Sequence, residues 1–122
     1  MMKIIYIFII FIFVNFISYK SNYLKIIYPN GGEKLQKGTI IDIKWETNCF
    51  NDRVSLILYK KGRQVKKIAI HVKNTGLYLW KIDENLRNSD FYRIRIRLES
   101  NLLINDFSDK NFTINDLPPL PK

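Results

Sequence analysis

Within the predicted strand of residues 91–98, residues 92–98 alternate strictly between two kinds of side chain. The apolar phase comprises Tyr92, Ile94, Ile96 and Leu98. The basic phase comprises Arg93, Arg95 and Arg97. A period of two residues is typical of a β-strand that buries one face and leaves the other in water. The segment therefore predicts a strand that lines a hydrophobic core.

The same alternation recurs along the chain between turn signals. Strands are predicted at residues 24–28, 39–46, 54–59, 64–72, 77–82, 91–98 and 112–114. Residues 60–63 favour a hairpin turn, residues 83–90 a polar loop anchored by Leu86, and residues 102–104 a short irregular segment. About seven short strands without an amphipathic helical pattern predict an all-β fold, an Ig-like or fibronectin III-like antiparallel β-sandwich over residues 24–115.

The phase of each predicted strand separates core side chains from surface side chains. The large residues expected between the two sheets are Trp45, Tyr78, Trp80, Tyr92 and Ile94. On residues 64–72 the inward phase carries Ile68, Ile70 and Val72, but also Lys66. A charged residue on a core phase predicts a bulge or an exposed start of the strand.

The first twenty residues have the pattern of a targeting segment. Lys3 precedes an apolar run from Ile4 to Ile17, interrupted only by Asn15. The run is shorter than the about 20 residues of a membrane-spanning helix. Residues 1–20 are therefore predicted to be a signal peptide, or alternatively an uncleaved signal anchor, and the domain to be secreted or tethered outside the membrane. Residues 116–122 are expected to form a Pro-rich disordered tail.

The titratable residues give little support to catalysis. The chain has one cysteine, Cys49, and one histidine, His71, which disfavours a disulfide framework and a multi-histidine zinc site. Asp106 and Asp109 could hold Ca²⁺ together, but Asp residues before a strand more often form turns. We therefore expect no cofactor, no metal and no enzymatic activity. A minimal hydrolase would require His71 to meet Ser and Asp side chains in a pocket.

The net charge of +9 suits an acidic partner, although the abundance of Ile, Lys and Asn also fits AT-rich codon usage. The candidate ligand-binding residues are Arg93, Arg95 and Arg97, with Tyr59 as an outward aromatic for stacking. The alternative is a solvated strand face paired with acidic side chains on a neighbouring strand. An acidic polymer or a cell-surface polysaccharide is the expected partner. Nucleic acid is not expected, and membrane contact is expected only through the N-terminal segment.

Four short motifs carry a resemblance to a known family. They are Pro29-Asn30-Gly31-Gly32-Glu33, Ile43-Lys44-Trp45, Asn74-Thr75-Gly76-Leu77-Tyr78-Leu79-Trp80 and Tyr92-Arg93-Ile94-Arg95-Ile96. In this order they resemble the Ser-Thr-rich GPI-anchored membrane family. Its fungal members include the N-terminal domain of the yeast proteins needed for cell-wall β-1,6-glucan assembly, and similar modules occur in prokaryotic secreted proteins.

The resemblance implies an Ig-like, extracytoplasmic module without catalysis. Its motif residues are then expected to be core and turn residues: Pro29, Gly31, Gly32, Trp45, Asn74, Gly76, Tyr78, Trp80 and Tyr92. The expected function is binding or scaffolding at the cell surface or cell wall. The alternatives are a carbohydrate- or polyanion-binding module that uses its basic sheet face and, less favoured, a minimal hydrolase.

Overall fold

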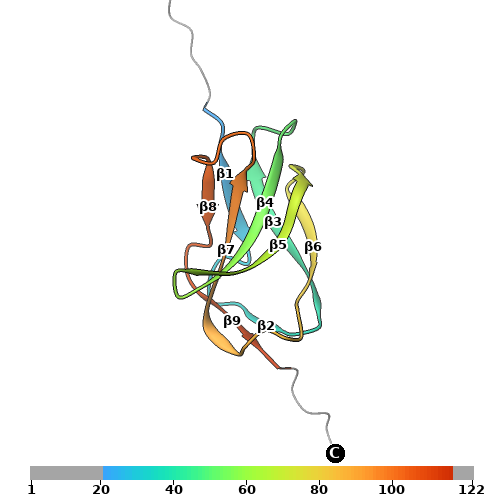
Figure 1. Ribbon diagram of the computed structural model, residues 1–122, viewed down its shortest axis with the longest axis vertical. Coiled ribbons are helices and arrows are strands. Elements are labelled where there is room, and N and C mark those ends of the chain that lie inside the picture. The colour runs from blue at the N-terminus through green and yellow to red at the C-terminus, as the bar shows by residue number, and fades with distance from the viewer. Residues whose placement is uncertain (1–20, 117–122) are drawn as a thin grey trace, which may run out of the picture.

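The computed structural model describes residues 21–116, which form nine β-strands in two sheets that pack face to face (Figure 1). No helix occurs within this range, so none there is long and apolar enough to cross a membrane. The all-β sandwich predicted from the strand pattern is confirmed. The predicted signal segment, residues 1–20, lies outside the described residues, as does the tail beyond Asp116.

The small sheet has the order β1-β3-β6 and is antiparallel. Its strands are β1 (Leu24–Tyr28), β3 (Ile40–Thr47) and β6 (Leu77–Lys81). The large sheet has the order β2-β9-β7-β4-β5, with β8 paired alongside β7. Its strands are β2 (Lys34–Gln36), β4 (Arg53–Lys60), β5 (Arg63–Lys73), β7 (Ser89–Leu98), β8 (Asn105–Phe107) and β9 (Phe112–Asn115).

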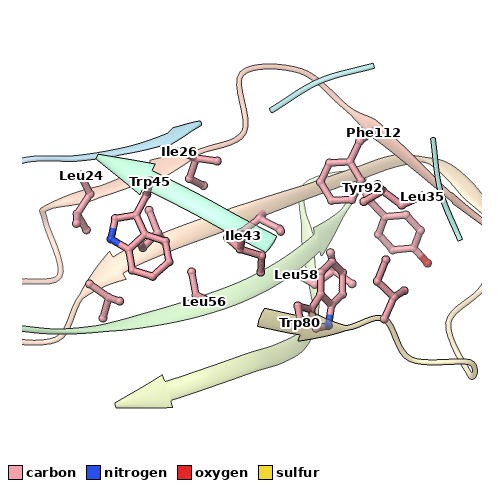
Figure 2. Packing of buried hydrophobic residues seen from close by; sticks show 14 of the residues in the cluster. Leu24, Ile26, Leu35, Ile43, Trp45, Leu56, Leu58, Trp80, Tyr92 and Phe112 are labelled. Carbon is pink, nitrogen blue, oxygen red and sulfur yellow. The ribbon is translucent and has the colours of Figure 1, made fainter. Parts of the chain in front are cut away.

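The core lies between the sheets and contains the residues expected there. Trp45 and Trp80 are 3% and 5% exposed, and Tyr92 and Ile94 are fully buried. Tyr78 is only half-buried and packs against the edge of the core. Figure 2 shows Trp45 beside Leu24 and Ile26, and Tyr92 with Phe112 and Leu35 farther along the sandwich. Burial of this apolar surface is the main favourable contribution to folding.

Tyr92 also has a polar role at the start of β7. Its hydroxyl donates a hydrogen bond of 2.5 Å to the carbonyl oxygen of Arg87, five residues upstream. Burial raises the pKa of the Tyr92 hydroxyl, and the charge of Arg87 opposes this shift. A tyrosine near the start of such a strand, bonded back to the preceding loop, is the tyrosine corner of Ig-like sandwiches.

Two strands were not predicted, and one pairing differs from the expected antiparallel order. Each of β2 and β8 has three residues, too few to show a period in the sequence. The β2 strand pairs with β9 in parallel. The β7 strand begins at Ser89, inside the predicted loop, while Leu86 is buried as expected.

The predicted irregularity of β5 is confirmed, but the inward position of Ile70 is wrong. The register between β4 and β5 shifts three times, and Val54 and Leu56 pair with Val72 and Ala69. Ile70 and His71 therefore lie opposite the single residue Ser55, one residue more than a regular ladder has. This bulge leaves Ile70 53% exposed. Lys66 is also exposed and forms an ion pair with Asp83.

Candidate functional site

The residues of the Pro29–Glu33 motif hold a turn together. The Glu33 carboxylate accepts the backbone N–H groups of Asn30 and Gly31 at 2.9 and 2.7 Å. The Asn30 side chain in turn exchanges two hydrogen bonds with Asp109, at 2.9 and 2.7 Å. The motif thus fastens the turn after β1 to the segment before β9, and its polar groups are engaged within the protein.

Asn74 also joins separate segments of the chain by hydrogen bonds, and its side chain is fully buried in the core. Its Oδ1 accepts the indole N–H of Trp45 at 2.7 Å. Its Nδ2 donates to the Thr47 hydroxyl and to the Cys49 carbonyl oxygen, both at 2.8 Å. A buried amide with these partners is a structural residue, because each of its polar atoms is satisfied.

Asp106 and Asp109 have different contacts within the protein. Asp106 Oδ2 accepts the backbone N–H of Ile26 at 2.8 Å, which ties β8 to the edge of β1. The Asp109 carboxylate accepts a hydrogen bond from the side-chain amide of Asn30. Within residues 21–116 no three His, Cys, Asp or Glu side chains are grouped as a metal ion requires. The turn interpretation is wrong for Asp106, which lies in β8, whereas Asp109 lies in the bend before β9.

His71 meets a serine and a carboxylate, but not in the order of a hydrolytic triad. Its Nδ1 lies 2.7 Å from one oxygen of Glu99, while the Ser55 hydroxyl donates to the other oxygen at 3.0 Å. Both side chains contact the carboxylate, so the imidazole does not contact the hydroxyl as a general base must. His71 is exposed, as predicted, and occupies a left-handed backbone conformation with φ 56° in the β5 bulge.

A groove of about 350 Å³ lies on the outer face of the large sheet. It is at the end of the sandwich where β4 turns into β5 and β7 begins. Its lining comprises Tyr59, Lys61, Gly62, Phe91, Arg93, Phe107 and Asn111. This groove, which we call the aromatic groove, brings together two of the predicted binding residues, Tyr59 and Arg93.

The aromatic rings of the groove are fixed by contacts with one another and with cations. Tyr59 and Phe107 meet edge to face, with ring centroids 5.0 Å apart. The guanidinium of Arg95 lies 5.1 Å from the Phe107 ring centre and donates to the Tyr59 hydroxyl at 3.1 Å. Lys61 Nζ lies 5.1 Å from the Phe91 ring. Such cation–π and edge-to-face contacts favour a preformed arrangement of the rings.

The three arginines of β7 have different surroundings. Arg93 lines the groove and donates from Nε to Asn111 Oδ1 at 3.2 Å. Arg95 supports Tyr59 and also donates to Asn105. Arg97 Nε is buried and has no hydrogen-bond partner among the described residues. Their direct neighbours on β4 are Tyr59, Ile57 and Ser55, so the register places no carboxylate opposite the arginines on that strand.

Sequence reasoning missed five groove residues: Lys61, Gly62, Phe91, Phe107 and Asn111. Phe91 had a usable signal, because it falls on the same outward phase as Arg93. Phe107 had none, because it reaches the groove on β8, a strand too short to predict from its pattern. Lys61 and Asn111 lie in connecting segments, where side-chain direction has no period.

A two-sheet sandwich with a tyrosine corner defines the class of protein as an Ig-like domain. Residues 28–114 match the family model of the Kre9/KNH-like N-terminal Ig-like domain, and the chain belongs to that family. The family is associated with the fungal cell wall and cell surface, and its Ig-like domain is a non-catalytic type. No curated protein and no solved structure gives a significant match.

Proposed function

We propose that this domain is an exported, non-catalytic module that binds acidic polysaccharide at the cell surface in the aromatic groove. The observation that carries the proposal is the composition of the groove. Three aromatic rings, from Tyr59, Phe91 and Phe107, stand with the cations of Arg93 and Lys61 around one hollow. Concave sites with apolar walls and a few polar groups are the usual form of a ligand site.

The two kinds of side chain have complementary tasks in this proposal. An aromatic ring packs against the apolar C–H face of a sugar ring, while its edge is held by neighbouring groups. The guanidinium of Arg93 can bind a carboxylate or phosphate group through paired hydrogen bonds, and Lys61 supplies a second, mobile charge. The volume of about 350 Å³ lies at the small end of ligand sites, which suits a short stretch of a polymer.

Two further observations support a place outside the cell. The family is associated with the cell wall and surface, and the apolar run from Ile4 to Ile17 predicts export. The net charge of +9 raises the local concentration of any polyanion near the domain.

The test compares matched variants in binding to two soluble polymers, polygalacturonate and neutral β-1,6-glucan. Arg93→Gln and Phe91→Ala change the groove. Lys67→Gln removes the same charge from an exposed position of β5 that does not line the groove. We expect the two groove variants to lose most binding of polygalacturonate and the Lys67 variant to keep it. Binding should weaken as salt rises, because exposed charges are screened within about 8–10 Å at physiological ionic strength.

Equal losses in Arg93→Gln and Lys67→Gln would show that binding depends on net charge alone, and the groove assignment would be wrong. Binding of β-1,6-glucan that requires Phe91 but not Arg93 would retain the groove and replace the acidic ligand by a neutral one. Absence of binding to both polymers by the wild-type protein would contradict the proposed function.

A further inference from the structure

Four large apolar side chains project from the end of the sandwich opposite the aromatic groove. Phe50 lies in the β3–β4 loop, Leu102 and Leu103 lie in the β7–β8 loop, and Tyr23 precedes β1. They are 67%, 55%, 89% and 45% exposed, in that order. We call these four residues the apolar tip.

The backbone pairings show that these loops share one end of the molecule. Leu24 pairs with Thr47, and the N–H of Tyr23 bonds to Asn48 in the β3–β4 loop. Val54 pairs with Leu98, so the start of β4 lies beside the end of β7. Figure 1 shows the β7–β8 loop at the same upper end as the start of β1.

The β7–β8 loop holds its two leucines outward through its own hydrogen bonds. The Leu103 N–H donates to the Asn101 side chain at 3.1 Å, and the Ile104 N–H donates to the Asn101 carbonyl oxygen at 3.0 Å. The Asn105 side chain donates to the Leu103 carbonyl oxygen at 3.2 Å. These hydrogen bonds stabilise a turn in which the Leu103 side chain is exposed to solvent. An exposed leucine contributes nothing to the core.

The sequence before β1 indicates what surface lies nearest to this tip. The apolar run ends at Ile17, and β1 begins at Leu24 at the tip end of the sandwich. The chain between these residues spans at most about 25 Å even when fully extended. A bilayer that holds residues 4–17 would therefore lie close to the apolar tip.

We propose that residues 1–20 act as the uncleaved signal anchor and that the apolar tip inserts into the interface of the lipid bilayer that holds this anchor. Apolar and aromatic side chains are favoured at the boundary between head groups and acyl chains. The charged residues at this end have both signs: Arg53 and Lys73 pair across β4 and β5, and Asp52 and Glu99 lie near them. Insertion is therefore driven by apolar contact and does not require anionic lipid.

This arrangement also orients the aromatic groove. The β4 strand runs from Arg53 at the tip end to Lys60 at the groove end. At about 3.3 Å per residue, this places the groove about 25 Å from the tip. The groove, on the outer face of the large sheet, then lies at the end of the domain that is farther from the membrane.

The test uses the full chain reconstituted in phosphatidylcholine vesicles, with an environment-sensitive fluorophore (NBD) on a single cysteine. Cys49→Ser removes the native thiol, and the hydroxyl keeps the polar neighbours Thr47 and Asn74. The probe is then placed at Leu103→Cys. The matched control is Asn85→Cys, an exposed position in the β6–β7 loop at the other end.

We expect blue-shifted emission at position 103, quenching by spin-labelled lipid and protection from iodide, and water-like emission at position 85. With the probe at Phe50→Cys, the double change of Leu102→Ser and Leu103→Ser should abolish most of the shift. Equal emission at positions 103 and 85 would overturn the proposal, as would a chain that does not remain with the vesicles. A shift that occurs without vesicles and grows with protein concentration would overturn it in favour of a second copy of this chain.

Discussion

Glu99 joins three strands although it lies just beyond the end of β7. Its carboxylate accepts the backbone N–H of His71, contacts the His71 ring and accepts the Ser55 hydroxyl. Desolvation alone would raise the pKa of Glu99. The hydrogen bonds from His71 and Ser55, with the charge of the imidazole, outweigh it and hold the pKa of Glu99 below its ordinary value of 4.5. The ionised carboxylate is thus the form that fits the fold.

This lowered pKa predicts a loss of stability in acid. A group whose pKa is lower in the folded state stabilises the fold above its unfolded pKa, and the contribution disappears as the pH falls through the folded value. We expect Glu99→Gln to unfold at lower denaturant concentration than wild type at pH 7, and the difference to shrink below pH 4.5. Urea titrations from pH 7 to pH 2.5 measure this difference.

Glu84→Gln serves as the control, because Glu84 is an exposed carboxylate in the β6–β7 loop. It should leave the wild-type profile unchanged. If the stability of Glu99→Gln differed from that of wild type by the same amount at every pH, the charge of Glu99 would not contribute to stability.

At the scale of the elements, the turn of residues 29–33 shows how a motif can be specific without binding a ligand. Gly31 and Gly32 both have positive φ, 145° and 82°. They differ in their surroundings. A Cβ on Gly31 would lie 2.6 Å from the Cβ of Lys110, whereas a Cβ on Gly32 would meet nothing within 4 Å. The first glycine is required by close packing and by conformation, and the second by conformation alone.

Substitution by alanine should separate these two requirements. We expect Gly32→Ala to cost about 1 kcal/mol, the usual penalty for a side chain at positive φ. Gly31→Ala should cost more, about 2–4 kcal/mol, because the segment before β9 must also move. The free energies of unfolding from urea titration measure both costs. Equal costs would mean that the contact with Lys110 relaxes freely.

Strands with several alternations could be predicted from the sequence, and the others could not. The β7 pattern is unambiguous because Tyr92, Ile94 and Ile96 are buried and the arginines between them are not. In β5 one extra residue between Ala69 and Val72 shifts the phase, so that Ile70 points away from the core. A periodic pattern cannot register such an insertion, because the pairing partner that reveals it lies on another strand.

At the scale of the whole molecule, the two tryptophans link the halves of the core. Trp45 lies on β3 and Trp80 on β6, both in the small sheet, and both face the large sheet (Figure 2). A domain of this size has a total stability of only about 5–15 kcal/mol. The loss of one indole is therefore a large fraction of the stability of the whole domain.

We expect Trp80→Ala to lower the free energy of unfolding by about 3–5 kcal/mol. Leu79→Ala, on the same strand but 62% exposed, should change it by less than about 1 kcal/mol. Denaturation followed by the fluorescence of Trp45 provides the measurement. A loss under about 1 kcal/mol for Trp80→Ala would contradict the core assignment.

The candidate site could be predicted only in part, for a reason that belongs to the whole fold. The outward phases of Tyr59 and Arg93 follow from single strands. The groove exists because β8 places Phe107 against Tyr59 and because the β4–β5 hairpin places Lys61 against Phe91. These contacts join residues far apart in the chain, which no local pattern reports.

The parallel pairing of β2 and β9 has a mechanical consequence. The described chain enters the sandwich at one end, through β1, and leaves at the other, through β9 (Figure 1). A force between residues 21 and 116 pulls β9 lengthwise past β2 and β7, and pulls β1 lengthwise past β3. Hydrogen bonds perpendicular or slanted to the pull are loaded together and do not open one after another. Resistance to tension along the chain therefore resides in these terminal strand pairs.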